Sequence, residues 1–190
     1  MKNIPFVDLK SQYLSIKSEI DNAIKKIIEN TSFIGGDELV KFSDSLSGLL
    51  NVKHSVTVAN GTDAIYIALK MLGVGEGDEV ITTAHSWIST SETITQTGAK
   101  PIFIDTNEFF CINTDLIESR ITKHTKAIIP VHLYGNSCDM SKINQLAKKY
   151  NLFVIEDCAQ AILTKYKNKC VGTIGDAGTI SFFPGKNLGA

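Results

Sequence analysis

The feature that most constrains the fold is a regular alternation of short apolar runs with stretches of helical periodicity. Six runs have the length and composition of buried strands: Ser55 to Ala59, Val80 to Thr83, Pro101 to Asp105, Ala127 to Leu133, Leu152 to Glu156 and Thr179 to Phe183. Apolar residues recur at helical spacing in four stretches around them: 20–28, 39–49, 64–72 and 143–150. Near-continuous apolar strands separated by amphipathic helices are typical of a mostly parallel sheet covered on both faces. We therefore predict an α/β, doubly wound fold, with ligands bound at the carboxyl ends of the strands.

Length and composition are those of an ordinary globular domain. The chain has 190 residues, of which 43% are hydrophobic and 21% charged, and its formal net charge is −1. This balance does not favour a nucleic-acid or membrane partner, and no apolar run approaches the ~20 residues of a membrane span. Four scattered cysteines without C-x-x-C spacing argue against a disulfide framework or a metal site. We expect a cytoplasmic protein that needs no structural metal.

The carboxyl end is unusual, because the chain stops at residues 186–190, directly after a strongly apolar stretch. Domains rarely end in this way without a polar tail. We expect a truncated chain.

The first predicted strand is followed by Asn60-Gly61-Thr62-Asp63 and then by a helix. Gly61 permits close approach of the backbone to a ligand, Thr62 offers a hydroxyl, and the helix N–H groups form an anion site. Helix capping by Thr62 or Asp63 explains the same residues equally well.

Aromatic residues and histidines follow the second and fourth predicted strands. Trp87, the one tryptophan of the chain, is placed to stack on a flat ring, although a core position is slightly favoured for it. His85 is either a proton carrier or a hydrogen-bonded structural histidine. Tyr134 either lines a pocket or belongs to a turn, and His132 is predicted to lie within its strand.

The last two predicted strands end in charged residues. Glu156 and Asp157 follow an apolar run, where carboxylates are costly to bury without a partner, so one of them is expected to face a cation. Lys186 follows the sixth strand and a Pro-Gly turn. Desolvation there suits a lysine for Schiff-base chemistry, whereas a surface lysine is the commoner case for any single lysine.

Together these residues supply an anion cradle, a stacking ring, an acid and an amine nucleophile. Pyridoxal phosphate (PLP) requires all four, and their joint occurrence in this order is the specific signal. The glycines of 73–77 follow a helix and precede a strand, which is the reverse of a dinucleotide-binding fingerprint. A nicotinamide-binding module is therefore the weakest alternative.

The whole chain resembles the DegT-type sugar aminotransferases, which are PLP enzymes of the aspartate aminotransferase fold type I. The similarity is carried by five segments: 4–9 (IPFVDL), 60–64 (NGTDA), 77–82 (GDEVIT), 156–161 (EDCAQA) and 181–189 (SFFPGKNLG). The last two are highly specific. The resemblance implies that residues 1–190 form the PLP-binding large domain, incomplete at its carboxyl end and without the small domain.

The resemblance also implies a role for each matching residue. Lys186 is expected to form the Schiff base and to carry the proton, and Asp157 to pair with the pyridine nitrogen. The expected cofactor contacts of the remaining residues are hydrogen bonding of the ring hydroxyl by Gln160, stacking by Trp87, and phosphate binding by Gly61, Thr62 and Ser181.

The implied reaction is amination of a keto-sugar nucleotide with glutamate as donor, by a homodimer with shared active sites. Related sugar dehydratases carry histidine in place of the lysine, so Lys186 disfavours that alternative. An inactive truncated fragment is a further alternative.

Overall fold

The computed structural model describes residues 4–189, which form two compact units. One unit contains the chain up to Thr57 together with the last residues, and the other runs from Val58 to Asn187.

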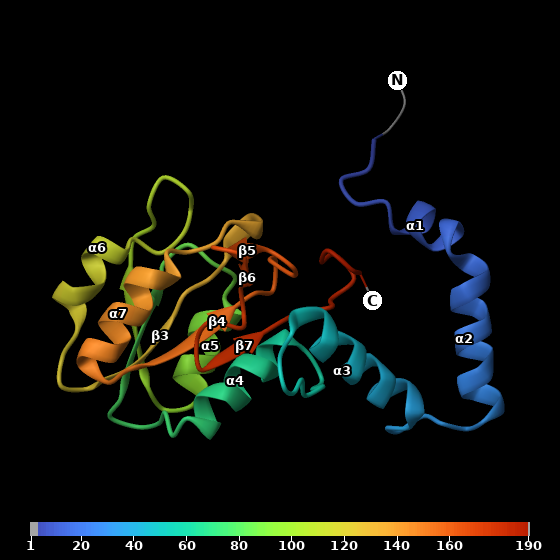
Figure 1. Ribbon diagram of the computed structural model, residues 1–190, viewed down its shortest axis with the longest axis horizontal. Helices are drawn as coiled ribbons and strands as arrows, with labels where there is room; N and C mark the ends of the chain where they lie inside the picture. Colours follow the sequence, from blue (N-terminus) through green and yellow to red (C-terminus); the bar gives the residue numbers. More distant parts are fainter. Residues whose placement is uncertain (1–3, 190) are drawn as a thin grey trace. The chain divides into compact units, whose positions relative to one another are not determined.

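The first unit is helical (Figure 1). Its helices are α1 (Leu9–Ser15), α2 (Lys17–Glu29) and α3 (Asp37–Leu50). Asp8 caps α1 by accepting a hydrogen bond from the N–H of Ser11. The periodic isoleucines do form one face of α2, but α2 buries none of its residues, and Ile24 and Ile28 are 53% and 57% exposed. Among the described residues, α2 therefore presents an apolar face that stays largely exposed.

The second unit is built on a five-stranded parallel sheet with the order β2-β1-β3-β4-β7. The strands are β1 (Glu79–Thr83), β2 (Lys100–Ile104), β3 (Thr125–Ile129), β4 (Phe153–Asp157) and β7 (Ala177–Thr179). A small antiparallel hairpin consists of β5 (Lys165–Tyr166) and β6 (Lys169–Cys170). The connecting helices are α4 (Gly61–Met71), α5 (Ser89–Gln96), α6 (Thr114–Ile117) and α7 (Met140–Tyr150), with short 3-10 turns η1 (Glu118–Arg120) and η2 (Leu133–Gly135).

Helices cover both faces of this sheet, as Figure 1 shows. Successive strand residues point to opposite faces, so Val80 packs with α4 and α5 on one side while Ile81 packs with α7 on the other. Val154 and Ile155 of β4 divide in the same way between the two cores. The predicted α/β, doubly wound and mostly parallel fold is confirmed.

Two predicted strands are placed differently in the structure. Ser55 to Ala59 forms no strand in the described chain; Val56 is 82% exposed and has no neighbouring strand to pair with. The last strand ends at Thr179 rather than Phe183, so 181–183 leaves the sheet. His132 also lies beyond its strand, since β3 ends at Ile129.

Candidate active site

The N-terminus of α4 lies beside the chain that leaves β7. Asn60 caps α4 by accepting a hydrogen bond from the Asp63 N–H, so the alternative of capping by Thr62 or Asp63 is wrong. A Cβ added to Gly61 would lie 2.9 Å from Cβ of Ser181, which means that only glycine fits this approach. The first N–H groups of a helix have no acceptor within it, so the start of α4 offers free backbone donors close to Ser181.

The first turn of α5 contacts two of the predicted site segments. The Ser89 and Thr62 hydroxyls are 2.8 Å apart, and the next residue, Thr90, bonds to Asp157 at the end of β4. Trp87 lies just before this helix and is 72% exposed, so the core position favoured for it is wrong. An exposed indole at this point has a face available to a ligand.

Asp157 is the last residue of β4 and is only 5% exposed. Its Oδ2 accepts a hydrogen bond from the Thr90 hydroxyl at 2.9 Å, and its Oδ1 accepts one from the Ala159 N–H at 3.1 Å. Burial raises the pKa of Asp157, and these two hydrogen bonds and the charge of Lys186 oppose that rise. A permanently cationic partner would stabilise the ionised form of such a buried carboxylate.

Glu156 points to the opposite face of the strand and is fully buried. Its Oε1 accepts from the N–H groups of Ile174 and Gly175, both at 2.7 Å, and its Oε2 lies 3.0 Å from Nε2 of His132. Nδ1 of His132 accepts from the Cys138 N–H, so the imidazole proton is on Nε2 and is donated to Glu156. Ligand atoms of His132, Glu156 and Cys158 all lie within 4.8 Å of one another. Glu156 nevertheless has its hydrogen-bond partners within the protein, in His132 and two backbone N–H groups. Glu156 is therefore a structural acid.

Lys186 lies in a turn after β7, where its N–H donates to the Phe183 carbonyl at 2.8 Å. The residue is half-buried, and its charge acts on the carboxylate of Asp157. No ion pair joins Lys186 to Asp157 among the described residues, so the expected cation beside one of the two carboxylates stays a prediction.

Gln160 lies three residues after β4, and its Oε1 accepts a hydrogen bond from the Tyr134 N–H at 3.0 Å. This contact directs the amide NH₂ of Gln160 away from Tyr134 as a donor. The Tyr134 ring contacts His85 and Phe110 at centroid distances of 6.2 Å and 5.7 Å. His85 therefore belongs to an exposed aromatic cluster and bonds to the Tyr134 hydroxyl at 3.3 Å.

The structure thus brings the predicted residues to the carboxyl edge of one sheet, while their roles stay predictions. Sequence reasoning missed Ser89 and Thr90, whose hydroxyls bond to Thr62 and Asp157. Their closeness in sequence to Trp87 could have indicated them. A helix that starts beside a strand end places its first turn at the same edge of the sheet.

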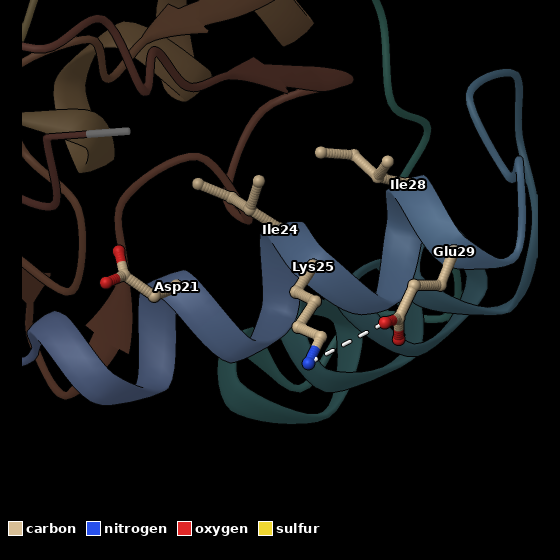
Figure 2. Close-up of a pocket in the computed structure, with 5 residues that line it drawn as sticks. All are labelled: Asp21, Ile24, Lys25, Ile28 and Glu29. Carbon is tan, nitrogen blue, oxygen red and sulfur yellow. Dashed lines mark ion pairs between the residues drawn. The ribbon is translucent and has the colours of Figure 1, made fainter.

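A pocket in the other unit lies along α2 and contains none of the predicted site residues. Figure 2 shows its lining of Asp21, Ile24, Lys25, Ile28 and Glu29, with an ion pair of 3.7 Å between Lys25 and Glu29. Among the described residues, no helix is long and apolar enough to cross a membrane.

Comparison with known proteins places this geometry in a family. Residues 14–190 match the model of the DegT/DnrJ/EryC1/StrS aminotransferase family. The chain is 48% identical to a pleiotropic regulatory protein of Geobacillus stearothermophilus, over 99% of this chain and 51% of that protein. It is 46% identical to the UDP-N-acetyl-3-dehydro-alpha-D-glucosamine 3-aminotransferase of Acidithiobacillus ferrooxidans, over 98% of this chain and 51% of that enzyme.

Solved structures agree with these relatives. Streptomyces venezuelae DesV, crystallised with a ketimine intermediate, matches 100% of this chain and 51% of its own with a TM-score of 0.93 and 36% identity. Bacillus subtilis NtdA, crystallised with the cofactor PMP, matches 100% of this chain and 43% of its own with a TM-score of 0.93 and 38% identity. The chain thus spans about half the length of the proteins it matches. On this similarity of sequence and fold, the chain belongs to the DegT/DnrJ/EryC1/StrS aminotransferase family.

Proposed function

We propose that this chain supplies the cofactor-binding part of a PLP-dependent aminotransferase that converts a keto-sugar nucleotide to an amino-sugar nucleotide. PLP is the cofactor of the family. The observation that carries the proposal is the buried Asp157 carboxylate, held by Thr90 and Ala159 and acted on by the charge of Lys186.

The residues fit this cofactor at both of its ends. The close approach of Gly61 to Ser181 supports phosphate binding by Gly61, Thr62 and Ser181, because the first N–H groups of α4 point to the same place. Asp157 suits a protonated ring nitrogen at the other end, because a buried carboxylate charge is costly without a cationic partner. When bound, PLP supplies an electron sink for the reacting carbon.

Each remaining side chain has a task in this proposal. The Lys186 amine would hold the cofactor, and it would move the proton at the reacting substrate carbon. The Trp87 face covers the ring, for which its 72% exposure leaves room. The Gln160 amide donates to the ring hydroxyl, an orientation that its bond from Tyr134 favours.

The proposed substrates are a keto-sugar nucleotide and glutamate. Relatives support the first, because their names include a UDP-sugar 3-aminotransferase and the dTDP-3-amino-3,6-dideoxy-alpha-D-galactopyranose transaminase of Aneurinibacillus thermoaerophilus, which is 43% identical over 94% of this chain and 50% of that enzyme. Homodimer formation is also proposed, and the exposed apolar side chains of α2 and of the loop after it support it. The chemistry takes place in the cytoplasm in this proposal.

The experiment is a pair of half-reactions with the protein as its gene encodes it, saturated with PLP. Glutamate should convert the bound cofactor to its amine form and release 2-oxoglutarate, as followed by absorbance. A keto-sugar nucleotide should then restore the original spectrum and appear as an amino sugar by mass spectrometry. A protein that binds PLP but shows no spectral change with glutamate or other amino acids would refute transamination.

A further inference from the structure

The carboxylate of Asp157 is held by a side chain that does not belong to the predicted cofactor contacts. Thr90, in the first turn of α5, is 1% exposed, and its hydroxyl is 2.9 Å from Oδ2 of Asp157. The Thr90 hydroxyl also lies 3.1 Å from the hydroxyl of Ser86, which precedes the helix. The two contacts form a short chain of hydroxyl groups that ends on the acid.

The protons available determine which group donates in each of these two hydrogen bonds. An ionised carboxylate can only accept, and threonine has one hydroxyl proton, so Thr90 donates to Asp157. The Ser86 hydroxyl must then donate to the oxygen of Thr90. Donation in series polarises each successive hydroxyl and strengthens the last bond.

We propose that Thr90 is a positioning residue that keeps Asp157 ionised and aimed at the ring nitrogen of the cofactor, with Ser86 reinforcing its bond. This inference rests on the proposed function, and Thr90 itself touches neither cofactor nor substrate in it. Because α5 also bonds to Thr62 through Ser89, one helical turn sets the acid relative to the proposed phosphate site.

The charges around Asp157 define what the loss of Thr90 would do. Burial raises the pKa of Asp157, and the Ala159 N–H, the Thr90 hydroxyl and the charge of Lys186 lower it. Its neighbours in sequence are Glu156, whose carboxylate is held by His132 and two backbone N–H groups, and Cys158, whose thiol stays neutral because burial raises its pKa. Removing the Thr90 hydroxyl therefore raises the pKa of Asp157 further and shifts the shared proton from the ring nitrogen to the carboxylate.

This proton shift is measurable without turnover. A protonated ring lowers the pKa of the nearby Schiff base on Lys186 by like-charge repulsion, so a neutral ring raises it. One hydrogen bond to a charged acceptor is equivalent to roughly one to two pKa units on that acceptor. We expect Thr90→Val, which keeps the shape and removes the hydroxyl, to raise the Schiff-base pKa by about one unit.

The experiment titrates the visible absorbance of the PLP-loaded protein, as its gene encodes it, against pH. Thr90→Ser should keep the wild-type Schiff-base pKa, and Ser86→Ala should raise it by less than Thr90→Val. The matched control is Thr93→Val, because Thr93 is fully buried one turn later and its hydroxyl bonds to the carbonyls of Ser89 and Thr90. Thr93→Val should leave the Schiff-base pKa unchanged.

The outcomes distinguish failure of the positioning role of Thr90 from failure of the proposed function. Wild-type protein that forms no Schiff base would overturn the proposed function itself. Wild-type protein that forms one, with the same pKa in Thr90→Val, would overturn only the positioning role. If Thr90→Val does not fold, the comparison of Ser86→Ala with Thr93→Val decides, since an unchanged pKa in Ser86→Ala refutes the hydroxyl chain.

Discussion

Replacing Glu156 by glutamine should destabilise the protein although the two side chains have the same shape. Oε1 of Glu156 accepts two backbone N–H bonds, and its Oε2 accepts from Nε2 of His132. Nδ1 of His132 is already occupied as an acceptor by the Cys138 N–H. A glutamine amide must therefore turn its NH₂ group either toward the Nε2–H of His132 or toward two backbone donors. In either orientation, the N–H donors of the glutamine amide face N–H donors of the protein.

The cost follows from these contacts. Loss of the bond from His132 leaves a buried donor unpaired, at about 1–3 kcal/mol. The two backbone bonds lose an ionic acceptor, which weakens each by roughly 0.5–1 kcal/mol. The smaller desolvation penalty of a neutral amide offsets part of this. We expect a net loss of about 2–3 kcal/mol in the free energy of unfolding.

The assay is urea unfolding at a series of pH values. Burial raises the pKa of Glu156, but the bonds from His132 and from backbone N–H groups of the loop 172–175 outweigh it and hold the pKa below its usual value. The stability that the ionised acid contributes is therefore present above its unfolded-state pKa and lost as pH falls through the lower folded-state pKa. The difference between wild type and Glu156→Gln should shrink across that acidic range.

The matched control is Glu108→Gln at an exposed position, which should change unfolding by less than about 0.5 kcal/mol. A Glu156→Gln variant as stable as this control, or a loss that does not diminish at acidic pH, would refute the account of the buried acid.

Three further predictions concern the site and the helical unit. Asp157→Asn should lower turnover with glutamate by about a hundredfold or more while weakening PLP affinity much less, because a neutral amide cannot stabilise a pyridinium; near-normal turnover would exclude Asp157 as the ring partner. Gly61→Ala should weaken PLP affinity by about 1–3 kcal/mol, since its methyl group would lie 2.9 Å from Cβ of Ser181; equilibrium titration with PLP measures this. Residues 1–190 expressed alone should self-associate without aminotransferase activity, because Ile24 and Ile28 are exposed; sedimentation of the double variant Ile24→Lys, Ile28→Lys should show less association, and unchanged association would exclude this face.

The sequence predicted the sheet of the second unit because its strands are apolar on both faces. Val80 and Ile81 illustrate this, since each packs into a different core. The strand predicted at Ser55 to Ala59 failed because an apolar run forms a strand only where a neighbour pairs with it. The final strand was displaced because its Ala177 and Gly178 lack the apolar signature, whereas the apolar residues after them leave the sheet.

The candidate site was predictable where the strand ends carry distinctive side chains, as at Asp157. From the residues alone it was not predictable which of the two adjacent acids bonds to Thr90 and which to His132, because that depends on the strand face to which each points. Thr90 escaped notice because a threonine within a helix has no distinctive pattern. Its role depends on α5 starting next to the end of β4, a contact between residues 67 positions apart.

The residue that binds PLP covalently can be identified directly. Borohydride reduction of the PLP-saturated protein, as its gene encodes it, fixes the cofactor to its amine partner, and peptide mapping by mass spectrometry then locates it. The account predicts a single pyridoxyl group on Lys186 and its loss in Lys186→Ala. A pyridoxyl group on Lys165 or Lys169, the lysines of the β5–β6 hairpin, would contradict it.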